Sequence, residues 1–499
     1  MKYKKRKKSL RKAIFQLLGG NVFSKALGVF REILTAYFFG TGQVIGAYRV
    51  AQTGTLVPIN FLTSDSLNSA FVPQYRQLLS VSRDSAQTLF WSIFILFGFI
   101  TLLLTSGLWL AAEQWIGLLA PGLPKAVSAL AVDMLRVMAV GVTFYLFSAL
   151  LMFLGMANED FLPMAIRPSL QNIGLIAGAI AAFSLGNARL LAWGFTLSYV
   201  MFFFGVLFRS YHKGFLKMPN EWAWLSVKEV LSGFWRTLRP LLLLPILLQG
   251  NIAIERAVGS LIGLAVLSSI DYAKFISETV ILLISMPVAF AGLGRWSEMS
   301  NEHMKQHLVE ILTPILLLAV PIAAFLSFNA HAVVEMMYSR GAFNTNSVAV
   351  TADILIGASV GVWAQVVGYV LIKALNAQRR NGVVLKVMML SLFANAAFNL
   401  LLYSKLGALT LGLGNSVYGL ILLVGTLSAL GLWRDFFERG WFLFFAAIGY
   451  FLINSSLPRS NDLFQELIVV TMVFLLYWFL CILAVPHFRK SMLRLFRRN

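Results

Sequence analysis

The feature that most constrains this sequence is the recurrence of apolar runs of about twenty residues along the whole chain. Fourteen such runs can be read between polar breaks, and a helix needs about 20 apolar residues to cross a bilayer. Hydrophobic residues make up 59% of the chain and charged residues 12%, whereas a soluble domain has about 45–50% and about 25%. The sequence therefore predicts an all-α polytopic membrane protein with about 14 transmembrane helices. It excludes a water-soluble, a disordered or a fibrous chain.

The predicted spans are 13–39, 45–66, 87–113, 127–156, 163–184, 191–208, 240–257, 269–294, 308–329, 348–377, 387–403, 410–433, 441–456 and 465–486. Pro58, Asn60 and Asp65 interrupt the second span, and we expect Pro287 and Gly292 to break the eighth. Irregular backbone at membrane depth is tolerated where it is buried in protein or lines a wet cavity. These two spans are thus expected to face the interior.

The distribution of basic residues predicts the orientation. With the N-terminus in the cytoplasm, the even-numbered loops and both termini contain 28 Lys and Arg, and the odd-numbered loops contain five. Cytoplasmic loops are enriched in basic residues, so we expect both termini in the cytoplasm. The net charge of +20 is concentrated in these cytoplasmic parts. It predicts contact with anionic phospholipids rather than with nucleic acid.

We expect two pseudo-symmetric six-helix lobes. The expected parts are a basic cytoplasmic tail at 1–12, an N-lobe at 13–208, a basic linker at 209–239, a C-lobe at 240–433, two further helices within 434–486 and a second basic tail at 487–499. A weak internal repeat favours this division, because Lys25-Ala26-Leu27-Gly28 resembles Arg256-Ala257-Val258-Gly259. A half-chain repeat is typical of transporters with two parallel lobes.

Charged residues inside the spans are the candidate functional residues, since a charge at the bilayer centre costs about 2.5–3.5 kcal/mol. Lys25 and Glu32 share a helix face, as do Asp271, Lys274 and Glu278. We predict a hydrated cavity lined by five cations and five acids: Lys25, Arg31, Arg49, Arg256 and Lys274, with Glu32, Asp65, Glu255, Asp271 and Glu278. A set of structural ion pairs is the alternative. It is the preferred interpretation for Arg136 with Asp133, for Arg167 and for Lys373.

Sequence motifs of enzymes are missing. There is no G-x-x-x-x-G-K-[ST], G-x-S-x-G or H-E-x-x-H, and the five His and one Cys (Cys481) show no metal-ligand spacing. We therefore expect a transporter without a catalytic site, metal or cofactor.

The order of several short motifs resembles the MurJ/MviN lipid II flippases of the multidrug/oligosaccharidyl-lipid/polysaccharide exporter superfamily. The matching stretches are 24–42, Ala70-Phe71-Val72-Pro73, 158–172, Glu255-Arg256 followed by Tyr272-Ala273, 338–343 with Arg340-Gly341, and Asn395 and Asn399 followed by Gly412-Leu413-Gly414. The resemblance implies a V-shaped, two-lobed protein with alternating access. Its cationic central cavity would hold the pyrophosphate of a polyprenyl-linked sugar, with Arg31 on a cavity arginine.

This sequence also departs from that family. Lys25 replaces a common Arg, and Gly46 stands where the family usually has Asp. The family also usually has an Arg near Ile59 and a Glu near Ser64. In the eighth span, Lys274-Phe275 replaces an Asp-Arg pair. These changes predict a rearranged anion site.

The expected function is a monomeric flippase that moves an undecaprenyl-pyrophosphate-linked saccharide from the cytoplasmic to the periplasmic face. The acidic cavity residues would couple transport to H⁺ or Na⁺, or the membrane potential would drive it. The saccharide would be lipid II or, alternatively, an exopolysaccharide or O-antigen repeat unit. More distant alternatives are a MATE-like cation or drug antiporter and a membrane scaffold.

Overall fold

The computed structural model describes residues 2–63, 65–220, 224–458, 462–486 and 488–489 of the chain. The described residues form helices joined by short turns, with no strand among them, which confirms the predicted all-α fold class. The chain divides into two compact units, Met1–Leu261 (unit 1) and Ile262–Asn499 (unit 2). The lobe and linker boundaries expected from the sequence stay a prediction.

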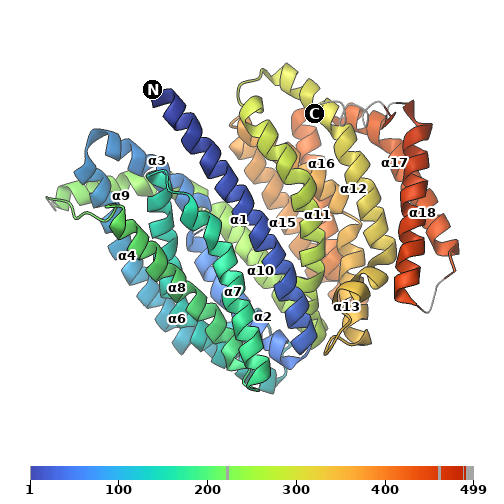
Figure 1. The fold of residues 1–499 in the computed structure, drawn as a ribbon, viewed down its shortest axis with the longest axis horizontal. Helices are drawn as coiled ribbons and strands as arrows, with labels where there is room; N and C mark the ends of the chain where they lie inside the picture. Colours follow the sequence, from blue (N-terminus) through green and yellow to red (C-terminus); the bar gives the residue numbers. More distant parts are fainter. Residues whose placement is uncertain (1, 64, 221–223, 459–461, 487, 490–499) are drawn as a thin grey trace. The chain divides into compact units, whose positions relative to one another are not determined.

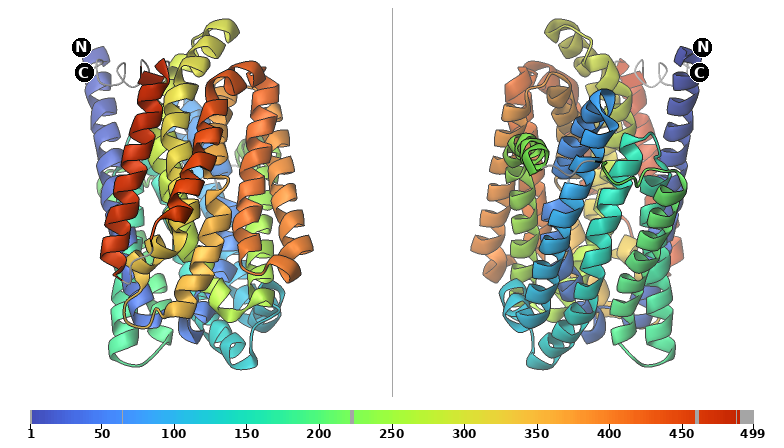
Figure 2. Two further views of the ribbon diagram at one scale, coloured as in Figure 1. Left: turned by 90° about the vertical axis from the view of Figure 1, so that its right-hand side faces the viewer. Right: turned by 90° about the vertical axis from the view of Figure 1, so that its left-hand side faces the viewer.

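Unit 1 is a bundle in which α6 packs against α2, α4 and α8, and α7 packs against α1 and α8. Its long helices run side by side in Figure 1 and in the right-hand view of Figure 2. Its helices are α1 (Lys2–Phe39), α2 (Gln43–Thr63), α3 (Asp65–Val81), α4 (Arg83–Leu110), α5 (Ala112–Leu119), α6 (Lys125–Ala157), α7 (Leu162–Ser184), α8 (Arg189–His212), α9 (Trp224–Leu238), a 3-10 turn (Arg239–Leu241) and α10 (Leu243–Ile262).

Glycines allow α7 and α8 to approach closely. A Cβ atom on Gly178 would lie 2.9 Å from both the Gly194 Cα and the Leu190 carbonyl oxygen. A Cβ on Gly174 would meet the Ser198 side chain at 2.5 Å. Small residues at such positions let membrane helices pack backbone to backbone. The α7–α8 pair is therefore a rigid part of unit 1.

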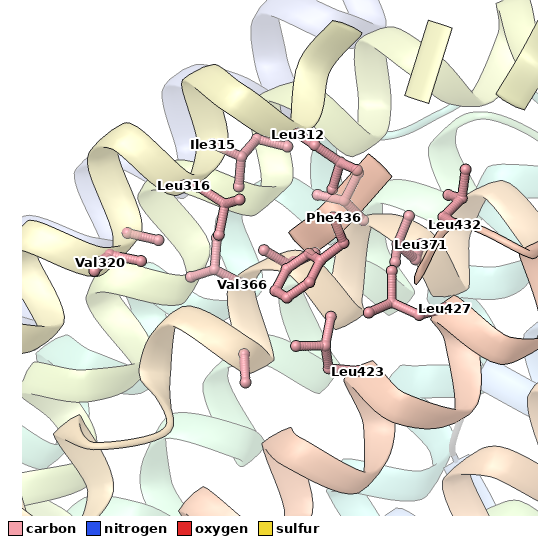
Figure 3. Close-up of a cluster of buried hydrophobic side chains, with 14 of the residues drawn as sticks. Leu312, Ile315, Leu316, Val320, Val366, Leu371, Leu423, Leu427, Leu432 and Phe436 are labelled. Carbon is pink, nitrogen blue, oxygen red and sulfur yellow. The ribbon is translucent and has the colours of Figure 1, made fainter. Parts of the chain in front are cut away.

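Unit 2 packs around a leucine-rich core on α12, α14, α16 and α17. Leu316, Val366, Leu427 and Phe436 lie in this core (Figure 3). The helices of unit 2 are α11 (Leu264–Trp296), α12 (Asn301–Tyr338), α13 (Thr345–Ser359), α14 (Val362–Ala377), α15 (Asn381–Leu406), α16 (Leu409–Leu430), α17 (Trp433–Ser456) and α18 (Leu463–Ala484).

Every predicted span overlaps a helix. Among the described residues, nine helices are long and apolar enough to cross a membrane, and two bent helix pairs bring the number to 11. The multi-pass character of the protein is thus supported by length and composition. The count of fourteen stays a prediction, because α1, α2 and α7 are not among these helices.

Helix continuity differs from the sequence-based expectation in four places. The expected interruption of the second span at Pro58 and Asn60 is wrong, since α2 continues through both residues to Thr63. The expected break at Pro287 and Gly292 is wrong, since α11 continues through both residues; proline is tolerated in membrane helices where neighbouring groups satisfy the freed carbonyl. The break lies instead in predicted span 348–377, where α13 and α14 are bent by 49°. At the N-terminus, α1 extends through the predicted tail to Lys2. Of the predicted tail at 487–499, all but residues 488 and 489 lie outside the described residues.

Candidate functional site

A short turn brings charged residues of α1 and α2 to the same depth. The two helices are joined at residues 40–42, where Gly40 has a φ of 54°; this left-handed conformation is readily available to glycine. Glu32 lies seven residues before the end of α1, and Arg49 lies six residues after the start of α2. At about 1.5 Å per helical residue, both side chains lie about 10 Å from the turn.

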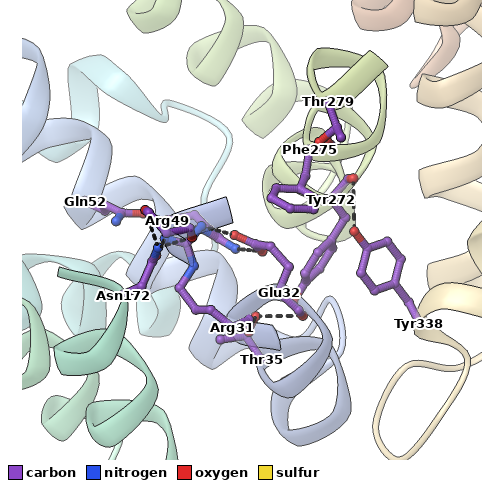
Figure 4. A network of polar contacts seen from close by, with 11 residues as sticks. Arg31, Glu32, Thr35, Arg49, Gln52, Asn172, Tyr272, Phe275, Thr279 and Tyr338 are labelled. Carbon is purple, nitrogen blue, oxygen red and sulfur yellow. Dashed lines mark hydrogen bonds and ion pairs between the residues drawn. The ribbon is translucent and has the colours of Figure 1, made fainter. Parts of the chain in front are cut away.

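Two arginines share the carboxylate of Glu32 (Figure 4). Arg49 Nη2 donates to Glu32 Oε2 at 2.5 Å, and Arg31 Nη2 donates to the other oxygen, Oε1. The side chains of Glu32 and Arg49 are 3% and 6% exposed, and that of Arg31 is 20% exposed. We call Arg31, Glu32 and Arg49 the arginine–glutamate triplet.

A third helix fixes Arg31. Asn172 of α7 accepts a hydrogen bond from Arg31 Nη1 at 2.8 Å, and its amide nitrogen donates to the Ser24 carbonyl at 3.0 Å. Both Nη atoms of Arg31 are therefore engaged, whereas its buried Nε has no hydrogen-bond partner among the described residues. Asn172 was not among the predicted site residues, and its place at the end of the matching stretch 158–172 was the available signal.

The triplet has a net charge of +1 from two guanidinium groups and one carboxylate. Arginine presents a planar set of donors that suits phosphate and carboxylate oxygens. An anion that enters could exchange for Glu32 as the partner of either arginine. Chemically, the triplet can therefore bind an oxyanion, and in its absence Glu32 partly neutralises the two cations.

The other predicted cavity residues are distributed over both units. In unit 1, Lys25 is exposed on α1, and Glu255 and Arg256 are buried on α10. On α11 of unit 2, Asp271 and Lys274 are partly buried and Glu278 is exposed. Asp65 begins α3, but its side chain lies outside the described residues. A shared role of these residues in a substrate cavity stays a prediction.

The cations assigned to structural pairs have different partners from those expected. Arg136 does not pair with Asp133. Its Nη2 lies 3.7 Å from Glu113 Oε1, and Asp133 instead pairs with Arg189 at 2.7 Å. Asp133 and Arg136 are three residues apart on one helix, but each finds a nearer partner on another element.

Aromatic rings are the partners of two further cations. The Arg167 guanidinium carbon lies 4.3 Å from the centre of the Tyr145 ring. The Lys373 ammonium lies 5.2 Å from the centre of the Tyr369 ring. Sequence periodicity alone gave no indication of the Arg167–Tyr145 contact, because these residues come from α7 and α6.

In unit 2, motif residues that are distant in sequence form one aromatic cluster. Tyr272 of α11, Tyr338 at the end of α12 and Phe343 have ring centres 5.1–5.6 Å apart. The Tyr338 hydroxyl donates to the Tyr272 carbonyl at 3.4 Å (Figure 4). Gly341, with a φ of 60°, provides the turn between Tyr338 and Phe343. The cluster thus anchors the loop at 339–344 to α11.

The turn between α6 and α7 is held by a buried carboxylate. Asp160 accepts two hydrogen bonds from Arg209, at 2.7 and 3.0 Å, and its Oδ2 lies 2.9 Å from Lys213 Nζ. Burial alone would raise the pKa of Asp160, but the hydrogen bonds and charges of Arg209 and Lys213 outweigh it and lower this pKa. Asp160 is therefore a structural anion, ionised at neutral pH.

The described residues contain no group of three or more His, Cys, Asp or Glu side chains that could hold a metal ion.

Comparison with known proteins identifies the family. The family model described as "Lipid II flippase MurJ" matches residues 35–480. The chain belongs to the lipid II flippase MurJ family. The matched range includes Arg49, Arg256 and Lys274 but begins after Lys25, Arg31 and Glu32. For those three residues, the likeness to MurJ proteins therefore depends on the motif at 24–42.

Relatives within the MurJ family are distant. A probable lipid II flippase MurJ of Synechocystis is 27% identical over 414 residues, which cover 77% of this chain and 75% of the relative. One from Thermotoga maritima is 22% identical over 404 residues, 80% of each chain.

Solved structures show the same fold. A lipid II flippase MurJ in an inward closed conformation aligns with a TM-score of 0.83 at 20% identity, covering 95% of this chain and 99% of that one. An inward-facing MATE multidrug transporter of the MOP superfamily has a TM-score of 0.67 at 14% identity, with 84% and 99% covered.

Proposed function

We propose that this protein is a flippase that moves an undecaprenyl-pyrophosphate-linked saccharide from the cytoplasmic to the periplasmic face of the bacterial inner membrane. Membership of the MurJ family supports this proposal, as do relatives described as probable lipid II flippases. The apolar helices of both units supply the membrane-spanning scaffold.

The observation on which the proposal rests is the arginine–glutamate triplet. A charged headgroup crosses hydrocarbon only at a high free-energy cost, so a flippase needs a polar path with groups of opposite charge. Arg31 and Arg49 lie within a bundle of apolar helices and share the carboxylate of Glu32. A pyrophosphate has enough oxygens to accept hydrogen bonds from both guanidinium groups.

The proposal includes transport by alternating access, with both termini in the cytoplasm. The excess of basic residues in the predicted cytoplasmic parts supports this orientation. We further propose that Glu32, Glu255, Asp271 or Glu278 couples transport to H⁺ or Na⁺, unless the membrane potential drives it. Transport is measured in vesicles with a pH gradient, a Na⁺ gradient or a membrane potential imposed alone. The condition that supports transport identifies which of the three driving forces is used.

Lipid II is the leading substrate because the family and its relatives are named for it. A second candidate, an exopolysaccharide or O-antigen repeat unit, is favoured by the core position of Ile59. This residue is fully buried and lies near the position where the family resemblance leads us to expect an arginine. An organic-cation substrate fits less well, because the triplet has a positive net charge and would repel it.

Depletion of the protein in its native host tests the proposal. Lysis with accumulated lipid II would identify lipid II as the substrate. Normal growth, with loss of a surface polysaccharide and accumulation of its lipid-linked repeat unit, would identify the second candidate. Normal levels of all lipid-linked saccharides after depletion would contradict both.

A further inference from the structure

Arg167 is a guanidinium inside unit 1 whose partner is an aromatic ring. It lies on α7, is partly buried, and stacks on the Tyr145 ring at 4.3 Å. Within the part of the chain that the structure describes, no Asp or Glu pairs with it. Ionisable residues in membrane helices usually pair with one another or mark a substrate path. The ring face offsets part of the charge but leaves the N–H donors of the guanidinium available.

Tyr199 of α8 presents a second available donor beside it. Its ring is 1% exposed and lies 4.7 Å, centre to centre, from that of Tyr145. Its buried hydroxyl has no hydrogen-bond partner among the described residues. Buried hydroxyl groups are nearly always paired, so this one is expected to have a partner that is not part of the bundle.

Arg31 connects these two residues to the triplet. Arg31 Nη1 donates to Asn172, which lies five residues after Arg167 on α7. Gly174, two residues further along α7, packs against Ser198, the neighbour of Tyr199 on α8. The Nη atoms of Arg31 are engaged by Glu32 and Asn172, whereas its Nε is buried without a hydrogen-bond partner. The close packing of α7 on α8 at Gly174 and Gly178 fixes the separation of the helices that hold Arg167 and Tyr199.

All three available groups are hydrogen-bond donors: Arg31 Nε, the Tyr199 hydroxyl and the Arg167 guanidinium. A water molecule could satisfy one of them. Among the described residues, however, Glu32 is the one carboxylate that pairs with Arg31 or Arg167, and two cations with one carboxylate favour an acceptor with negative charge. We propose that Arg167, Tyr199 and the Nε of Arg31 form a second oxyanion subsite in unit 1, which holds a phosphate or carboxylate of the transported lipid-linked saccharide. This inference rests on the proposed function. It extends the site from the triplet on α1 and α2 to α7 and α8.

Binding to the purified full-length protein in detergent tests the subsite. The probes are undecaprenyl pyrophosphate, lipid II, and lipid II with its carboxylates amidated. Arg167→Gln should weaken lipid II binding by at least about tenfold, which is the usual effect of losing a charge-assisted hydrogen bond. Tyr199→Phe keeps the ring packing and should weaken binding by about three- to tenfold.

The matched control is Arg136→Gln. Arg136 also lies over an aromatic ring, 5.6 Å from the centre of Trp109, but it pairs with Glu113 and belongs to neither the triplet nor the subsite. Its replacement should leave all three affinities unchanged. If Arg167→Gln does not fold, the binding assay uses Arg167→Lys, which keeps the charge but loses the planar donor set. The two single variants Arg167→Lys and Tyr199→Phe then report on the subsite.

The three probes separate the two sources of the oxyanion. If the subsite holds a phosphate, Arg167→Gln weakens the binding of undecaprenyl pyrophosphate as much as the binding of lipid II. If it holds a carboxylate, Arg167→Gln weakens only the binding of lipid II, and amidated lipid II binds equally well to the variant and to the wild type. Unchanged binding of every probe by Arg167→Gln and Tyr199→Phe, while Arg49→Ala weakens binding, would overturn the subsite and leave the proposed function standing. Failure of the wild-type protein to bind any probe would overturn both.

Discussion

Arg49 and Glu32 lie 17 positions apart in the sequence and meet across two helices, with Arg49 Nη2 donating to Glu32 Oε2 at 2.5 Å. Glu32 also receives Arg31 on its other oxygen. The carboxylate therefore has a dual role. It stabilises two cations in the apolar bundle, and it occupies the positions on both arginines that an oxyanion would take.

We expect Glu32→Gln to destabilise the protein, because two largely buried guanidinium groups would lose their shared carboxylate. Removing one partner of a buried ion pair typically costs about 3–5 kcal/mol. The partial exposure of Arg31 puts the expected loss in the free energy of unfolding near the lower value, about 3 kcal/mol. Thermal unfolding of the purified protein in detergent measures it.

Glu113→Gln is the control for this prediction. Glu113 is 74% exposed and lies 3.7 Å from Arg136, and such surface pairs contribute about 0–1 kcal/mol. Its replacement should leave the melting temperature nearly unchanged. Equal melting temperatures for Glu32→Gln and Glu113→Gln would show that the triplet does not contribute to stability.

Asp160 predicts a pH dependence of stability. Its pKa is lower in the folded than in the unfolded chain, because the contacts with Arg209 and Lys213 outweigh burial. The stabilisation is therefore fully present above the unfolded pKa of about 3.9 and is lost as the pH falls through the lower folded value. Asp160→Asn should lower the free energy of unfolding by about 1–2 kcal/mol near neutral pH. This value allows for the partial exposure of both basic partners, which weakens the ion pairs.

The measurement is the difference in melting temperature between wild type and Asp160→Asn as a function of pH. The difference should be constant near neutral pH and shrink below about pH 4. Glu438→Gln is the control, because Glu438 is 59% exposed and pairs with Arg434, whose side chain is 90% exposed. Such a surface pair contributes about 0–1 kcal/mol, so this variant should change the melting temperature little. A difference that grows with acidification would contradict the assigned ion pairs.

Close packing of α7 on α8 predicts a contrast between two glycines. Gly178→Ala would place a methyl group 2.9 Å from backbone atoms of α8, and such overpacking typically costs about 1–3 kcal/mol. Gly205→Ala lies on α8 with open space around its Cβ position and should stabilise the helix by about 0.5–1 kcal/mol. Melting temperatures that fall for Gly178→Ala and rise slightly for Gly205→Ala would agree with the structure. The reverse order would contradict it.

The positions of the helices followed closely from the sequence, because apolar runs of about twenty residues have few alternatives in a bilayer. Helix continuity was harder to predict. Pro287 did not break α11, whereas a bend of 49° separates α13 from α14. Backbone continuity at a proline depends on which neighbours satisfy the freed carbonyl, and sequence periodicity does not contain that information.

For the candidate site, the sequence indicated Arg31, Glu32 and Arg49 as charged residues in membrane spans, but not how they pair. The pairing of Glu32 with two arginines depends on the depth of α2 beside α1, which the turn at 40–42 fixes. Arg167 was interpreted as a structural cation because it lies near the end of its predicted span, and its contact with the Tyr145 ring on another helix was not predicted. Contacts between side chains of separate helices require the packing, which spacing along one helix cannot supply.

The final prediction concerns transport through the triplet. Arg31→Ala removes a cation that faces the proposed pyrophosphate path, and Arg31→Lys keeps the charge but loses the planar donor set. We expect Arg31→Ala to reduce the rate of flipping of the lipid-linked substrate by about 10- to 100-fold. The loss should be smaller for Arg31→Lys, and both variants should insert normally into the membrane.

The control is Arg189→Ala, which should transport normally. The Arg189 side chain is 60% exposed and pairs with Asp133. The assay is flipping in reconstituted vesicles, together with rescue of the depleted host. Transport by Arg31→Ala at the wild-type rate would exclude the triplet as the pyrophosphate site, whatever the saccharide.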